Sequence, residues 1–185
     1  MRRLLLAPVV LAALVVAVPV QAEPGHVFRE VVHEDDLNVI EDFCEAGLTV
    51  QSHFVADIGV KAMPRGRDGL IYFANKLRIT ETFTNVANGK SVVSTVTGID
   101  KDLRVTDNGN GTLTILIVST GNALVTDASG KAIARNPGQT RFELVVDDGG
   151  TPNDPTDDTE LSAEIVKGST GRTDDFCGAV VPALS

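Results

Sequence analysis

The chain has 185 residues and is acidic, with 25 Asp and Glu residues against 16 Lys and Arg residues and a formal net charge of -9. This charge argues against nucleic acid and anionic membrane surfaces as partners, because both select for Lys and Arg. Tryptophan is absent and Tyr72 is the single tyrosine, which argues against a carbohydrate-binding module with stacked aromatic rings.

Residues 1–22 have the layout of a secretory signal peptide. Two arginines are followed by a long apolar stretch and by "VQA", which places small residues at the cleavage positions. The apolar stretch is interrupted by prolines and is short for a bilayer. We therefore expect cleavage after Ala22 and a secreted, extracellular protein without a membrane anchor.

Residues 23–46 form a polar lead, which we expect to hold a short strand and one helical turn. From residue 47 to residue 185 the pattern changes to alternation of apolar and polar residues, rich in Val, Ile, Thr and Phe, as in "LTVQSHFVA" and "KLRITETF". Such alternation is typical of half-buried antiparallel strands. It predicts about eight strands in one β domain, over residues 48–58, 69–75, 76–86, 90–98, 101–107, 111–119, 122–136 (as a strand or a small hairpin) and 139–147, followed by 159–167.

Turn signals separate these segments at short spacing. "DNGNGT", between "LRVT" and "LTILIV", is the strongest of them, because Asn-Gly supplies the positive φ that tight hairpins need. Short connections favour an up-and-down meander, and closure into a barrel removes its exposed edges. We predict an all-β fold, a single antiparallel up-and-down β-barrel, with a two-sheet β-sandwich as the alternative.

The two cysteines lie in two similar phrases, "EDFCEAG" at 41–47 and "TDDFCG" at 173–178. In an exported chain, Cys44 and Cys177 are most simply a disulfide, because an oxidising compartment disfavours free thiols or a metal pair. A bond that closes more than a hundred residues stabilises a fold by about 5 kcal/mol in the chain-entropy model. We expect it to join the beginning of the domain to its end.

Glu81 interrupts an apolar face between Ile79 and Phe83, where an unpaired carboxylate is costly. If this face lines a barrel interior, Glu81 is a candidate ligand-contacting residue, together with Tyr72 and Phe83. If the strand bulges or lies at an edge, Glu81 simply reaches water. The sequence leaves both interpretations open.

The stretch "DDGGTPNDPTDDTE", residues 147–160, is the most acidic loop of the chain. Its carboxylates are hard oxygen ligands of the kind that Ca²⁺ prefers, although their spacing does not match the helix-flanked calcium loop. The alternative is a solvated hairpin loop stiffened by proline. No other cofactor is expected. The candidate calcium ligands are Asp147, Asp148, Asp154, Asp157 and Asp158.

The runs "KDLRVTDNGNGTLTILIVSTGNALV", "GKAIARNPGQTRFELVVD", "GGTPNDPTDD" and "VKGSTGRTDDFC" resemble a group of small exported actinobacterial proteins of unknown function. The resemblance extends over nearly the whole mature chain. It implies secretion, a β-rich single domain and two bracketing cysteines. It assigns no catalytic residue.

Motifs for nucleophilic, metal-dependent or phosphate chemistry are missing, among them G-x-S-x-G, H-E-x-x-H and glycine-rich phosphate loops. The leading hypothesis is therefore an exported, non-enzymatic binding protein that holds a small apolar ligand in a barrel interior. One alternative is a small barrel enzyme of the cyclase or isomerase type, with Glu81, His53 or Tyr72 as its polar groups. The other is an extracellular adhesion module stiffened by Ca²⁺ through the acidic loop.

Overall fold

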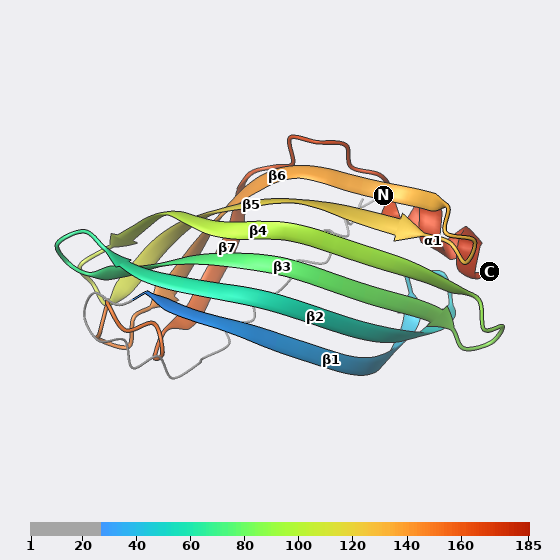
Figure 1. Ribbon diagram of the computed structural model, residues 1–185, viewed down its shortest axis with the longest axis horizontal. Coiled ribbons are helices and arrows are strands. Elements are labelled where there is room, and N and C mark those ends of the chain that lie inside the picture. Colours follow the sequence, from blue (N-terminus) through green and yellow to red (C-terminus); the bar gives the residue numbers. More distant parts are fainter. Residues whose placement is uncertain (1–26) are drawn as a thin grey trace.

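The computed structural model describes residues 27–185, which form one antiparallel sheet with a short helix at one end (Figure 1). The strands follow one another in chain order, and the sheet curls into a half-barrel. The elements are β1 (Phe28–Phe43), β2 (Leu48–Arg65), β3 (Leu70–Asn85), β4 (Ser91–Asp107), β5 (Thr112–Thr126), β6 (Ala132–Asp147), β7 (Thr159–Lys167) and α1 (Phe176–Leu184).

The predictions of an all-β fold and of an up-and-down meander are confirmed. Three finer predictions are wrong: the barrel is not closed, the strands number seven rather than eight, and one sheet replaces the two sheets of a sandwich. Neighbouring predicted strands fuse, so that 69–75 and 76–86 become β3, while 90–98 and 101–107 lie within β4. Polar residues interrupt the apolar alternation at these points, but the backbone ladder between β3 and β4 continues through them.

The polar lead contains β1, a strand of 16 residues, where the sequence predicted only a short strand and a helical turn. The sheet therefore begins at Phe28, well before residue 47. Pairing with β2 along almost its entire length, from Phe28 with Ala62 to Phe43 with Leu48, holds β1 in the sheet. The predicted signal peptide lies outside the described residues.

Burial alternates along the strands and identifies the inner face of the half-barrel. On β2, Val50, Ala56 and Ala62 are buried. Cross-strand pairing extends this face across the sheet, because opposite residues in a ladder share a face. The residues of the remaining strands that face the inside can thus be assigned from the pairing register.

Glycines line up where β4, β5 and β6 cross the middle of the half-barrel. Gly98 pairs with Gly121, and Gly121 pairs with Gly138. A Cβ atom at Gly121 would lie 2.7 Å from the carbonyl oxygen of Thr97 and 3.0 Å from the Cα atom of Gly98. Glycine is required for this close approach of two backbones, a means by which sheets bend.

Helix α1 fills the inside of one end of the half-barrel, at the right of Figure 1. Val180 and Leu184 are fully buried there against Val50, Phe83 and other inner residues of the strands. The side chain of Asp175 caps the helix, since its Oδ1 accepts a hydrogen bond from the amide of Gly178 at 2.9 Å. Within residues 27–185, no helix is long and apolar enough to span a membrane.

The predicted disulfide between Cys44 and Cys177 is confirmed, with Cα atoms 5.6 Å apart. It joins the turn after β1 to the first turn of α1. The phenylalanines that precede the two cysteines also meet: the ring centroids of Phe43 and Phe176 are 6.2 Å apart, and both pack on Phe83. The repeated phrase thus supplies a disulfide and an aromatic contact at the same place.

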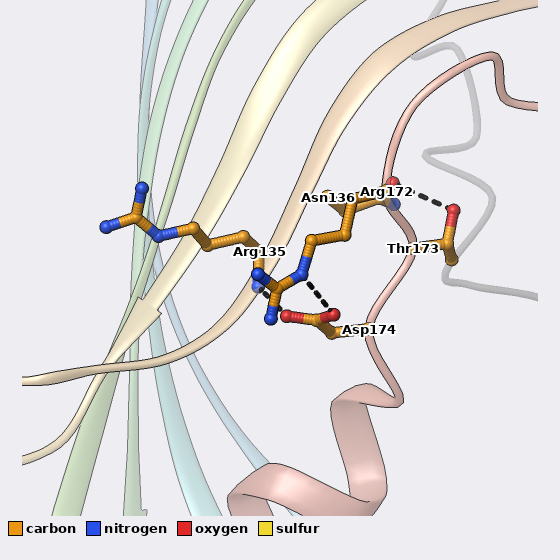
Figure 2. A network of polar contacts seen from close by, with 5 residues as sticks. All are labelled: Arg135, Asn136, Arg172, Thr173 and Asp174. Carbon is orange, nitrogen blue, oxygen red and sulfur yellow. Dashed lines mark hydrogen bonds and ion pairs between the residues drawn. The ribbon is translucent and has the colours of Figure 1, made fainter.

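The segment between β7 and α1 runs beside the first half of β6, where polar contacts hold it (Figure 2). Asp174 Oδ2 accepts a hydrogen bond from the backbone amide of Arg135 at 3.0 Å. Asp174 Oδ1 accepts one from Arg172 Nε at 2.6 Å, and the Arg172 guanidinium lowers the pKa of Asp174. These contacts position α1 at the end of the half-barrel.

Candidate functional site on the inner face

The inner face of the half-barrel is anionic. Every Lys and Arg of the seven strands occupies an outer position according to the pairing register. The inner positions of the first four strands, by contrast, include the carboxylates of Glu30, Glu34, Asp36, Glu81, Asp100 and Asp102. This separation of charge between the two faces is the basis of the candidate site.

One cross-strand row of the inner face is largely polar. Glu30 pairs with Val60, Val60 with Asn75, Asn75 with Asp100, Asp100 with Ser119, and Ser119 with Thr140. The register places all of these side chains on the same line across the sheet. We call Glu30, Asn75 and Asp100 the acceptor row.

Each member of the acceptor row carries a buried oxygen that has no hydrogen-bond partner within residues 27–185. The three atoms are Glu30 Oε2, Asn75 Oδ1 and Asp100 Oδ1. A buried acceptor without a donor costs about 1–3 kcal/mol, so three in one row are unusual for a purely structural surface. A hydrogen-bond donor that reached these oxygens would remove this cost.

Asp102 lies two residues from Asp100, on the same face of β4, and is 5 % exposed. Its Oδ2 accepts a hydrogen bond from the backbone amide of Phe73 at 2.6 Å. Burial is the main reason that the pKa of Asp102 is raised to about 6. The hydrogen bond from the Phe73 amide and the charge of Arg65 lower this pKa, whereas the charge of Asp100 raises it. Burial also raises the pKa of Asp100, and a hydrogen bond with Ser119 opposes this.

Glu81 lies on the inner face, between the buried side chains of Ile79 and Phe83. Because β3 is an interior strand of the sheet, the alternative that Glu81 reaches water at an edge is wrong. Its Oε1 accepts a hydrogen bond from the hydroxyl of Ser52 at 2.5 Å. Glu81 is thus one of the polar groups of this face and is held by a partner on β2.

The other predicted ligand-binding residues do not join Glu81 in one site. Phe83 is 6 % exposed and belongs to the core beneath α1. Tyr72 lies about 30 Å along β3 from Glu81. The hydroxyl of Tyr72 accepts a hydrogen bond from the amide of Val105 at 3.1 Å. The guanidinium of Arg65 lies 4.7 Å from the centroid of the Tyr72 ring. Both residues therefore have structural contacts.

His53, the third polar group considered for an enzyme, occupies the outer face of β2. Its Nε2 lies 2.8 Å from Asp35 Oδ1 on β1, and both side chains are about half exposed. His53 and Glu81 are consequently on opposite faces of the sheet. The three residues considered for a cyclase or isomerase are not assembled.

The acidic loop between β6 and β7 uses its carboxylates in local turns. Asp148 Oδ1 accepts a hydrogen bond from the amide of Gly150 at 2.9 Å, and Asp157 Oδ2 accepts one from the hydroxyl of Thr151 at 2.6 Å. Asp147 accepts a similar hydrogen bond from the amide of Gly149, and Asp154 accepts hydrogen bonds from the amide and the hydroxyl of Thr156.

At the centre of this loop, burial raises the pKa of Asp158 to about 6, and the charges of Asp157, Asp148, Asp154 and Asp147 add to the effect. In the part of the chain that the structure describes, no group of three or more His, Cys, Asp or Glu residues is arranged to hold a metal ion. The geometry therefore lends no support to the predicted calcium site.

Sequence reasoning missed the acceptor row and Asp102. "ANK" at 74–76 and "GIDKD" at 98–102 each interrupt an apolar alternation and lie where two short predicted strands meet. The signal that could have found them is the spacing of Asp100 and Asp102, which places both on one face of a strand if the strand continues.

No family model, curated protein or solved structure matches this chain. The resemblance to small exported actinobacterial proteins therefore stays a prediction.

Proposed function

We propose that the protein is an exported, non-enzymatic binding protein that holds a small apolar ligand against the inner face of the half-barrel. The observation that carries this proposal is the apolar middle of that face on β2 and β3. Phe54, Ile58, Val60 and Leu77 are half-buried there, whereas α1 fills only one end. An apolar sheet face is stable when a second layer covers it, and a ligand supplies such a layer.

The composition of this face suits ligand binding. Binding sites for small molecules are mostly apolar and carry a few polar groups that orient the ligand. The acceptor row and the Glu81–Ser52 hydrogen bond are such groups on this face. Export is supported by the disulfide, which persists in oxidising compartments.

The proposal is tested by titrating the protein with a neutral fluorescent apolar probe, N-phenyl-1-naphthylamine, and then displacing the probe with dodecanol. We expect saturable binding with a Kd in the micromolar range, about −8 kcal/mol. Val60→Thr, which places a hydroxyl on the inner face while keeping a β-branched side chain, is expected to weaken binding several-fold.

Val31→Thr is the matched control, because Val31 lies on the outer face of β1 and is 73 % exposed. Circular dichroism of both variants checks that they fold. Binding that does not saturate, or that both substitutions weaken equally, would contradict the proposal.

A further inference from the structure

The proposed function does not specify the chemical class of the ligand. The polar groups of the inner face indicate that class. We propose that the ligand is a cationic amphiphile: a molecule with a protonated amine that contacts the acceptor row and an apolar chain that lies along the inner face. This inference rests on the proposed function and specifies the chemistry of its ligand.

The charge of the inner face favours a cation. The strands place no Lys or Arg side chain at an inner position, while carboxylates from β1, β3 and β4 converge there. An anionic head group, such as a fatty acid carboxylate, would meet like charges without a compensating base. A cation would meet Glu30 and Asp100, and charge-assisted hydrogen bonds are about twice as strong as neutral ones.

The hydrogen-bonding capacity of the row favours a donor. Its three unpaired buried atoms are all acceptor oxygens, on Glu30, Asn75 and Asp100. A primary ammonium group has three N–H donors and no acceptor. It therefore matches the chemistry of the row, whereas an ether, ester or carboxylate head group would leave these oxygens unpaired.

The surroundings of the row suit an apolar chain. The next cross-strand row toward α1 consists of Val32, Ile58, Leu77 and the glycines at 98, 121 and 138. Beyond it lie the buried side chains of Ala56 and Ile79. Apolar and small residues thus occupy the middle of these two rows, between Glu34 on β1 and Asn136 on β6, and Glu81 lies in the row after them. The chain of an amphiphile would lie on this apolar stretch.

The test compares three probes of equal chain length, each well below its micelle concentration: dodecylamine, which is protonated at neutral pH, dodecanol and dodecanoate. Binding to the full chain, with its disulfide intact, is measured by isothermal titration calorimetry at low salt. We expect the amine to bind at least about tenfold more tightly than the carboxylate, with the alcohol between them.

Asp100→Asn keeps the shape of the side chain and removes its charge. We expect this substitution to weaken amine binding about tenfold and to leave alcohol binding nearly unchanged. Glu30→Gln is the second variant, used if Asp100→Asn does not fold, and has the same expected direction. Asp57→Asn on the outer face, which removes the same charge away from the row, is the control and should alter neither affinity.

The outcomes separate the two proposals. Equal affinity for all three probes, or equal loss of amine binding in Asp100→Asn and Asp57→Asn, would overturn the inference about the amine while the proposed function stands. Absence of binding for all three would overturn the proposed function as well.

Discussion

Asp102 provides a test of the electrostatics of the inner face through protein stability. The substitution Asp102→Asn removes the charge of a carboxylate that is 5 % exposed. It retains an oxygen at the position where Oδ2 accepts the hydrogen bond from the amide of Phe73. The change thus isolates the cost of placing a negative charge at this position.

The magnitude follows from the pKa of Asp102, which burial raises from its ordinary value of 3.8 to about 6. Each pKa unit corresponds to about 1.36 kcal/mol, so ionisation of this group destabilises the folded state by about 3 kcal/mol at pH 8. Between the two pKa values, the folded state binds more protons than the unfolded state. The contribution of Asp102 therefore lowers stability as the pH rises from about 4 to about 6, and below pH 4 it disappears.

The assay is urea unfolding of the original protein and of Asp102→Asn at intervals from pH 3.5 to pH 8. We expect the free energy of unfolding of the variant, relative to the original, to increase by about 3 kcal/mol over this range. Asp57→Asn is the control on the outer face, where an exposed ion pair contributes about 0–1 kcal/mol. A difference between Asp102→Asn and the original protein that does not change with pH would refute the reasoning.

Three further predictions concern the architecture. Replacing Cys44 and Cys177 with serine should lower the free energy of unfolding by about 5 kcal/mol, because the bond closes a separation of 133 residues; an unchanged urea midpoint would contradict this. Gly121→Ala should destabilise by about 1–3 kcal/mol, since its Cβ would lie 2.7 Å from a carbonyl oxygen of β4. Gly168→Ala, with no atom within 4 Å of its Cβ, should change stability by less than about 1 kcal/mol in the same assay. Asp175→Ala should cost about 1 kcal/mol through the lost cap of α1, and a thermal midpoint equal to that of the original protein would count against the cap.

Local chemistry explains why much of the fold was predictable. Alternation of apolar and polar residues is a property of short segments, so the strands of the meander were found from segments such as "KLRITETF". The "DNGNGT" hairpin between β4 and β5 was found from its Asn-Gly dipeptide. The disulfide followed from two cysteines and the expectation of export.

Helix α1 was not predicted because its sequence, "FCGAVVPAL", is apolar on all sides and contains both glycine and proline. Such a segment has no amphipathic pattern and little intrinsic tendency to form a helix. Its conformation depends on burial of Val180 and Leu184 inside the half-barrel, on the Asp175 cap and on the disulfide. These are contacts with residues far away in the chain.

By itself, the sequence determined the all-β class, the chain order of the strands and the identity of the bonded cysteines, because each depends on local pattern or on the number of cysteines. The tertiary structure decided that the sheet stays open and that polar residues from three strands share one row. Glu30, Asn75 and Asp100 belong to β1, β3 and β4, and only the register of the intervening strands aligns them. Register and curvature are set by pairing, glycine contacts and packing across the whole sheet, which no single segment encodes.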